Sequence, residues 1–276
     1  MVTERSEKQG MAATSATARR STGKLGLAFY ICQRELASRY AGSILGVLWP
    51  IIFPAIQIAL YAAVLHFGLR LQVGGGASLL ASLIAGMLPW FAFNDALTTM
   101  SGSITGNASL VKHLAIPAAL LPVSSLLAAG AVHCAMIMVA TVVLALLGNW
   151  PGLQMVSLLY FGLCLGILTL AIGSILAFAN AGFRDVAHAV GPVLGLWFWA
   201  TPIIWPVERL PANLHWIATA NPMSYVVAGY RWSMLGSNAA PVDMAGGLSF
   251  WTITAILVVC AWLSFRLFGR ELADLV

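Results

Sequence analysis

Charged side chains are scarce in this sequence. Asp, Glu, Lys and Arg together make up 8% of its 276 residues, whereas hydrophobic residues make up 60%. An ordinary soluble domain carries about 25% charged residues, most of them on its water-facing surface. Charge is missing altogether from five long stretches, at residues 40–69, 71–94, 113–183, 186–207 and 244–265. The composition therefore excludes a soluble fold and indicates an integral membrane protein.

The sequence also lacks the patterns that carry enzyme chemistry. Its nine acidic residues form no plausible facing pair within a hydrophobic stretch, and its five histidines have no HExxH or other ligand spacing. No GxxxxGK[ST] phosphate loop is present, so we expect no ATP, metal or other cofactor on this chain. The four cysteines include no CxxC pair and indicate neither a disulfide framework nor a zinc site.

The charge-free stretches predict six transmembrane helices. Each is long enough to cross a bilayer core of about 30 Å, because a helix rises about 1.5 Å per residue. The longest has to cross twice, and it divides at Gly148-Asn149-Trp150-Pro151-Gly152, where glycine and proline predict a tight turn. We therefore expect an all-α membrane protein with spans at residues 43–68, 78–100, 119–147, 153–180, 187–205 and 247–267.

The basic residues predict the orientation of these spans. With a cytoplasmic N-terminus, eleven of the 14 Lys and Arg residues lie inside, and only Arg70, Arg209 and Arg231 lie outside. This distribution favours an N-in, C-in topology. The net charge of +5 then reflects topology and gives no reason to expect nucleic acid. We expect four regions: a disordered cytoplasmic tail at 1–23, an interface helix at 24–41, a transmembrane domain at 42–270 and a cytoplasmic C-terminus at 271–276.

Two segments are predicted to lie at the cytoplasmic surface. Residues 24–41 form an amphipathic helix whose apolar residues recur at three- and four-residue spacing: Leu25, Phe29, Cys32, Leu36 and Tyr40. Between the second and third spans, Ser109 to Ile116 can form a short helix with Leu110, Val111 and Leu114 on one side. Each segment could rest on the membrane or on the protein's own ends, or could dock a partner, and the pattern leaves both open.

Prolines interrupt the helical pattern in two places. Pro50 and Pro54 predict a kink or a fresh start in the first span, which could be a hinge or merely a shape. Between Trp205 and Asp243 the chain is too polar for one span and too apolar for an ordinary loop. We expect two short helices there, at 210–219 and 222–235, that dip into the outer leaflet against protein or a water-filled cavity. Such an arrangement is typical of a pore mouth.

Aromatic residues gather near the same outer level. They could form the interfacial belt of any membrane protein, or they could line a passage in which rings stack on the apolar faces of sugars. The group comprises Trp90, Phe91, Phe93, Trp197, Phe198, Trp199, Trp205 and Trp216. Among the intramembrane polar residues, we expect His133 to be a hydrogen-bonded structural histidine, and Asp95 could report a polar cavity.

Motifs along most of the chain resemble a known family. The segment Arg34-Glu35-Leu36-Ala37-Ser38-Arg39-Tyr40, followed by Leu48-Trp49-Pro50, resembles the entry segment of the ABC-2 type permeases that export lipid-linked polysaccharides. Further matches follow in order over residues 25–270: Gly86-Met87-Leu88-Pro89-Trp90, Asn107 with Lys112 and Pro117, Phe183-Arg184-Asp185-Val186, Thr201 to Pro206, Asn221-Pro222 and Gly229-Tyr230-Arg231. One departure is Ala118-Ala119, where many relatives carry a charged pair.

The resemblance implies an assembly in the bacterial cytoplasmic (inner) membrane. Two copies of the chain would form a homodimer with a channel for a lipid-linked, undecaprenyl-type polysaccharide of the O-antigen, capsule or teichoic-acid type. Two copies of a separate ATP-binding subunit would hold ATP and Mg beneath it. A drug or small-lipid exporter of the same superfamily would share the topology without needing an aromatic lining. A secondary transporter should instead show paired broken helices and intramembrane acids.

The resemblance also assigns roles to individual residues. Contacts with the ATPase would come from Arg34, Arg39, Ser109, Leu110, Val111, Lys112 and His113. The aromatic lining would comprise Tyr61, Trp90, Phe91, Phe93, Trp197, Trp199 and Trp205. The periplasmic gate would include Pro206, Pro211, Asn221, Pro222 and Arg231, and the cytoplasmic loop Arg184 and Asp185.

Overall fold

The computed structural model describes residues 24–268, apart from residues 41, 44, 69–77, 115–116, 151 and 208–210. The expected tails at 1–23 and 271–276 therefore lie outside the described residues. Within the described residues, five helices are long and apolar enough to cross a membrane. They are α3 (Trp49–Ala63) with its continuation η2 (Val64–Gly68), α4 (Leu79–Ser101), α6 (Leu120–Leu146), α7 (Ser157–Gly182), which η4 (Gly152–Val156) precedes, and α11 (Met244–Phe268).

The fifth expected span differs from the prediction. The expected span runs over residues 187–205, but α8 (Asp185–Ala200) has only 16 residues and ends at Ala200. Its length is about 24 Å, which is shorter than a bilayer core of about 30 Å. Thr201 has extended backbone angles, φ −97° and ψ 134°, because the residue before a proline is disfavoured in the helical region. Pro202 therefore ends α8 inside the expected span.

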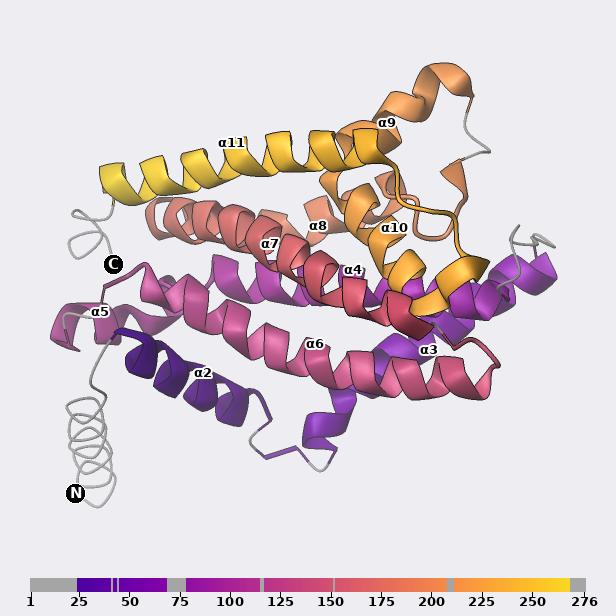
Figure 1. Cartoon of the computed structure of the whole chain (residues 1–276). Coiled ribbons are helices and arrows are strands. Elements are labelled where there is room, and N and C mark those ends of the chain that lie inside the picture. The colour runs from indigo at the N-terminus through magenta and orange to yellow at the C-terminus, as the bar shows by residue number, and fades with distance from the viewer. Residues whose placement is uncertain are drawn as a thin grey trace.

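Helix α4 lies at the centre of the bundle (Figure 1). It packs against α6 on one side, α7 and α10 on another, and α3 and α8 on the remainder. All residues from Ala81 to Trp90 are buried. By contrast, α3 and α11 lie at the edges and expose much of their apolar surface. α4 is therefore the central and most buried of the five long helices.

Two short helices occupy the segment between α8 and α11, as predicted. α9 (His215–Ala220) follows the turn η6 (Ala212–Leu214), and α10 covers Pro222–Leu235. Asn221 caps α10 by accepting a hydrogen bond from Met223 N at 3.0 Å, and Pro222 occupies the first turn, where its missing N–H costs nothing. Val226 and Tyr230 of α10 are fully buried, so this helix inserts into the bundle rather than covering it.

α2 (Lys24–Tyr40) packs along the first half of α6. Its buried side chains are Ala28, Ile31 and Cys32, whereas Phe29 of the expected apolar face is 58% exposed. Contact with α6 buries Ala28, Ile31 and Cys32, so Phe29 stays free for the membrane surface or a partner, the two alternatives that the sequence left open. The start of α2 and the end of α11 both lie at the end of the bundle that carries α5 (Ala108–Leu114) (Figure 1).

Gly229 allows α10 to approach α7 closely, and its replacement should weaken the fold. A Cβ atom at this position would lie 2.1 Å from the Cδ1 atom of the Phe161 ring. We expect Gly229→Ala to lower the free energy of unfolding by about 1–3 kcal/mol, because the ring has to move within a packed core. The midpoint of thermal unfolding in detergent measures this loss. Gly166→Ala on α7 is the control, since nothing lies within 4 Å of its Cβ; equal midpoints for the two variants would contradict the prediction.

Candidate functional site

A charged network fastens α2 to the membrane helices. The guanidinium of Arg39 lies 2.9 Å from a Glu35 oxygen and 3.0 Å from an Asp95 oxygen on α4. The other oxygen of Glu35 accepts a hydrogen bond from Ser125 Oγ on α6 at 2.9 Å. Burial opposes the charge on Arg39, but Asp95 and Glu35 outweigh that effect and raise the pKa of the guanidinium above its usual value. One chain of ionic hydrogen bonds therefore links three helices.

The predicted ATPase-contact residues divide into an exposed and a buried group. Ser109 and Arg34 are exposed, and Arg34 Nη2 donates to Asn107 Oδ1 at 2.8 Å. Leu110 and Val111 are each only 8% exposed, because they pack in an apolar cluster with Ile31, Ile104, Leu121 and Phe178. The side chains of Lys112 and His113 lie outside the described residues. Of the two alternatives left open by the sequence, Leu110 and Val111 therefore rest against the protein's own helix ends.

Asn180 connects this apolar cluster to α8 and was not predicted. Its side chain is 3% exposed, and Nδ2 donates to Thr105 Oγ1 at 3.2 Å in the turn η3 (Thr105–Asn107). Its Oδ1 accepts from the backbone N–H of Ala187 in the first turn of α8 at 3.0 Å. Arg184 and Asp185, by contrast, are exposed in the turn between α7 and α8. The only sequence signal for Asn180 was a single amide near the end of an apolar run.

Five of the predicted lining residues, Tyr61, Trp90, Phe93, Trp197 and Trp199, form an aromatic cluster with Phe198, which was not among the assigned site residues. Phe198 contacts Tyr61, Trp90 and Trp199, with ring centroids 5.5–5.8 Å apart, and Phe93 meets Trp197 edge-on at 5.3 Å. Such tilted and edge-to-face contacts between rings are favourable. The aromatic cluster therefore joins α3, α4 and α8.

The seven predicted lining residues differ in exposure. Phe93 is fully buried and Trp90 is 5% exposed, so within one chain these two side chains are core residues. Tyr61, Phe91, Trp197 and Trp205 are half-buried. Trp199 is 59% exposed, on the side of α8 opposite Val190, Leu194 and Phe198, which are buried. Of the predicted lining, Trp199 alone among the described residues is mostly free to contact a cargo.

Asn221 connects the aromatic cluster to the short helices. Its Oδ1 accepts from Trp197 Nε1 at 3.0 Å as well as from the first turn of α10, and its Nδ2 donates to Thr201 Oγ1 at 2.9 Å. The end of α8 and the start of α10 are therefore tied together by one amide. Pro206 and Pro211, the other predicted gate residues in this region, flank residues 208–210.

Arg231 holds the chain that follows α8. Its Nη1 donates to the carbonyl of Pro202 at 2.9 Å, Nη2 donates to the carbonyl of Ile203, and Nε donates to the carbonyl of Ser82 on α4 at 3.4 Å. Gly86 makes room for the guanidinium, since a Cβ there would lie 2.9 Å from Nη2. The carbonyls that follow the end of α8 have no helical hydrogen-bond partner. Inside an apolar bundle they need donors from the protein, and Arg231 supplies these donors.

His133 is hydrogen-bonded, as expected. Its Nε2 lies 2.8 Å from the hydroxyl of Tyr230, and both side chains are buried between α6 and α10. Among the described residues, no group of three or more His, Cys, Asp or Glu side chains could hold a metal ion. The His133–Tyr230 pair is therefore a polar contact between α6 and α10.

Comparisons with known proteins agree with this architecture. The sequence model of the ABC-2 type transporter family matches residues 27–235. The chain is 29% identical over 211 residues to the O-antigen export system permease protein RfbA of Myxococcus xanthus, covering 75% of this chain and 79% of the relative. It is 28% identical over 204 residues to a protein of the same name from Klebsiella pneumoniae, covering 73% and 77% of the two chains.

Removing Arg39 should loosen α2. In Arg39→Ala, the carboxylates of Glu35 and Asp95 lose their shared donor, and we expect a cost of about 1.5–3 kcal/mol for hydrogen bonds to a charged group. Amide hydrogen exchange along α2 should rise, while exchange in α7 stays unchanged. Arg266→Ala is the matched control, because this exposed residue of α11 contacts the Trp262 ring and no part of α2. Unchanged exchange in α2 of the Arg39 variant would show that the network does not hold the helix.

Removing the donors of Arg231 should destabilise the segment after α8. Arg231→Met keeps the length of the side chain but leaves the carbonyls of Pro202 and Ile203 without these bonds, at a cost of roughly 1–3 kcal/mol for each group. Gly86→Ala should act in the same direction by displacing the guanidinium. The readout is the thermal unfolding midpoint. Gly102→Ala, at the other end of α4, has no atom nearer than 4.0 Å to its Cβ and serves as the control; a midpoint unchanged in both test variants would refute the assigned role.

Proposed function

The chain belongs to the ABC-2 type transporter family, and from this premise we propose that it is the channel-forming permease subunit of an ATP-driven exporter. Its cargo is a lipid-linked, undecaprenyl-type polysaccharide, which it moves across the bacterial cytoplasmic (inner) membrane without altering it chemically. The observation that carries this proposal is the similarity to two O-antigen export permeases over about three quarters of each chain. A separate ATP-binding subunit, in two copies, holds ATP and Mg.

The channel lies between two copies of the chain in this proposal. The exposed side of α8 carries Gly191, Gly195, Leu196 and Trp199, while the opposite side packs on the aromatic cluster. Because glycines on this exposed side have no side chain, two facing copies of α8 would leave space between them for a polymer. In this arrangement Trp199 contacts the glycan, and Trp90 and Phe93 support it from behind through Phe198.

The sixth membrane crossing is completed by α8 together with the segment after it. We place the α5 end of the bundle in the cytoplasm, because this orientation puts eleven of the 14 basic residues inside. α9 and α10 then lie at the periplasmic end and form the gate, where Asn221 and Arg231 tie them to α8 and α4. The gate prolines Pro206, Pro211 and Pro222 fix where its helices begin and end.

We propose that movement of the ATP-binding subunits reaches the gate through the contacts at the cytoplasmic end of the bundle. Closure of the ATP-binding subunits pushes on α5, at the exposed Ser109, and on Arg34, and we assign Lys112 and His113 to the same contact. The buried side of α5, with Leu110 and Val111, passes the movement to α2 and α7. Asn180 passes it from Thr105 to the first turn of α8, beside the Arg184–Asp185 turn. A helix that moves as a rigid element then shifts the gate at its other end.

Reconstitution tests the proposal directly. The chain and its ATP-binding partner, purified together in nanodiscs, should hydrolyse ATP faster when lipid-linked glycan is added. In cells, deletion of this chain should stop surface display of the glycan and make the lipid-linked polymer accumulate inside. Normal display without internal accumulation would contradict the proposed cargo, as would an ATPase that responds to a small lipid or drug but not to the glycan.

Replacing Trp199 should reduce export without harming the fold. Trp199→Ala removes an exposed ring on which sugars stack, and we expect roughly a tenfold loss of export if the ring contributes about 1.4 kcal/mol to moving the polymer. Surface glycan per cell, normalised to protein abundance in the membrane, is the measurement. The control is Trp150→Ala, which removes a 70% exposed ring from the turn between α6 and α7. Equal export by both variants would favour a small-lipid or drug exporter.

A further inference from the structure

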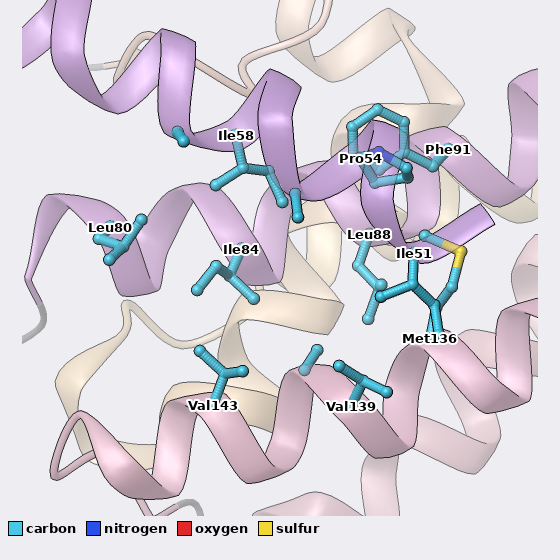
Figure 2. Close-up of a pocket in the computed structure, with 13 residues that line it drawn as sticks. Ile51, Pro54, Ile58, Leu80, Ile84, Leu88, Phe91, Met136, Val139 and Val143 are labelled. Atoms are coloured by element: carbon cyan, nitrogen blue, oxygen red, sulfur yellow. The ribbon is translucent and has the colours of Figure 1, made fainter. Parts of the chain in front are cut away.

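A cavity of about 230 Å³ opens between α3, α4 and α6 (Figure 2). It lies apart from the aromatic cluster's buried centre, and its lining is apolar throughout, with Ile, Leu, Val, Ala, Met, Phe and Pro side chains. Figure 2 shows Ile58 from α3, Ile84 from α4 and Val139 and Val143 from α6 around one shared space. Along α4 the lining extends from Leu80 to Phe91, a distance of about 16 Å at 1.5 Å per residue. The cavity is therefore a trench parallel to the helices.

The floor and the mouth of the trench are clearly distinguished by burial. Ile84 and Leu88 of α4 are 7% and 3% exposed and form the floor. Ala55 and Ala59 on α3 are exposed, and Val139 and Val143 on α6 are 40% and 37% exposed, so these residues form the two rims of the mouth. The trench therefore opens sideways, between two membrane-spanning helices, rather than toward either end of the bundle.

The exposed side chains next to the mouth show that the trench opens toward the lipid bilayer. Beside the rims lie Ile56 and Leu60 of α3 and Val142 of α6, each about 60% exposed. These side chains belong to helices that are apolar and long enough to span a membrane, so their exposed faces contact the hydrocarbon of the bilayer. The mouth is continuous with this lipid-facing surface.

Neither water nor vacuum is a stable occupant of the trench. Water needs two or more polar partners, and the described residues that line the trench offer no polar side chain, while apolar cavities of order 150 Å³ are known to stay dry and to take up small hydrocarbons. An empty cavity forfeits the dispersion contacts of every atom in its wall. A hydrocarbon chain from the adjoining bilayer needs no polar partner, and it restores the dispersion contacts of the wall atoms.

We propose that this trench is a binding site for one acyl chain of a membrane phospholipid. Its lining covers the first half of α4 and the second half of α6, both remote from α5, so the lipid belongs to the leaflet at that end. The site recognises the chain and not the headgroup, because the lining has no charged side chain. The acyl chain fills the seam between α3 and α6, which pack on each other far less than either packs on α4. The lipid is thus an integral part of the packing of α3.

Photolabelling of the full chain in vesicles tests the site without any transport assay. The vesicles consist of phosphatidylethanolamine and phosphatidylglycerol with a trace of phosphatidylcholine that carries a diazirine in the middle of one acyl chain. After illumination, peptide mass spectrometry should find label on residues 80–91 and 136–143 well above that on the exposed face of α11 near Ile256 and Val259. Exchanging the headgroup of the labelled lipid should not change this pattern.

Two pairs of variants then distinguish a bound chain from the surrounding lipid. Ala59→Phe on α3 and Val143→Phe on α6 fill the mouth from opposite rims, and each should reduce the label on residues 80–91 roughly tenfold. Ala63→Phe and Val142→Phe add the same ring to exposed positions outside the trench and should leave the label unchanged.

Three results would overturn the proposal. Label spread evenly over all exposed apolar faces would mean that no chain is held. Equal label in the filled variants and their controls would place the lipid elsewhere. Absence of label together with oxidative cross-linking of Ala59→Cys between two chains would show that a second copy covers the trench.

Discussion

Backbone groups released inside an apolar bundle have to find partners within the protein, and this constraint governs the structure around the end of α8. The helix stops at Ala200 because Thr201 precedes Pro202, and the carbonyls beyond it need donors. Arg231 and Asn221 supply them from α10 and from its N-cap. To bring these donors to the end of α8, α10 has to lie inside the bundle. Gly86 leaves space for the Arg231 guanidinium, and Gly229 lets α10 approach α7 closely.

The two ends of the bundle are held by different kinds of interaction. At the α5 end, an ionic chain through Arg39 and an apolar cluster around Phe178 join α2, α4, α6 and α7. At the other end, aromatic rings and hydrogen bonds join α8 and the segment after it to α10, with Trp197 donating to Asn221 and Arg231 donating to the backbone carbonyls of Pro202 and Ile203. Like the central helix α4, α8 contacts both systems, through Asn180 at its start and Asn221 at its end. A helix connected in this way is suited to pass movement from one end to the other, as the proposed export cycle requires.

The apolar surface of the chain has more than one partner in this account. In the proposed exporter, the exposed stripe of α8 faces a second copy and the moving glycan, and the exposed outer faces of α3, α6 and α11 are left to contact lipid. The trench between α3 and α6 is the place where lipid enters the packing itself. α3 packs mainly on α4, and its Tyr61 ring also contacts Phe198 of α8. Pro54, which is buried within α3, lines the trench.

The sequence alone determined that the chain is a membrane protein and where most of its helices lie. Charge-free runs, together with the Gly148–Gly152 turn, identified the long helices, and Asn221-Pro222 marked the start of α10, because these signals depend on local chemistry. Burial could not be derived in this way. In a membrane, the lipid-facing and the packed sides of a helix are both apolar, so the pattern did not distinguish exposed Phe29 from buried Ile31, or exposed Trp199 from buried Phe93. Those assignments, the carbonyl partners of Arg231 and the role of Asn180 were decided by which helices became neighbours, since each depends on residues far apart along the chain.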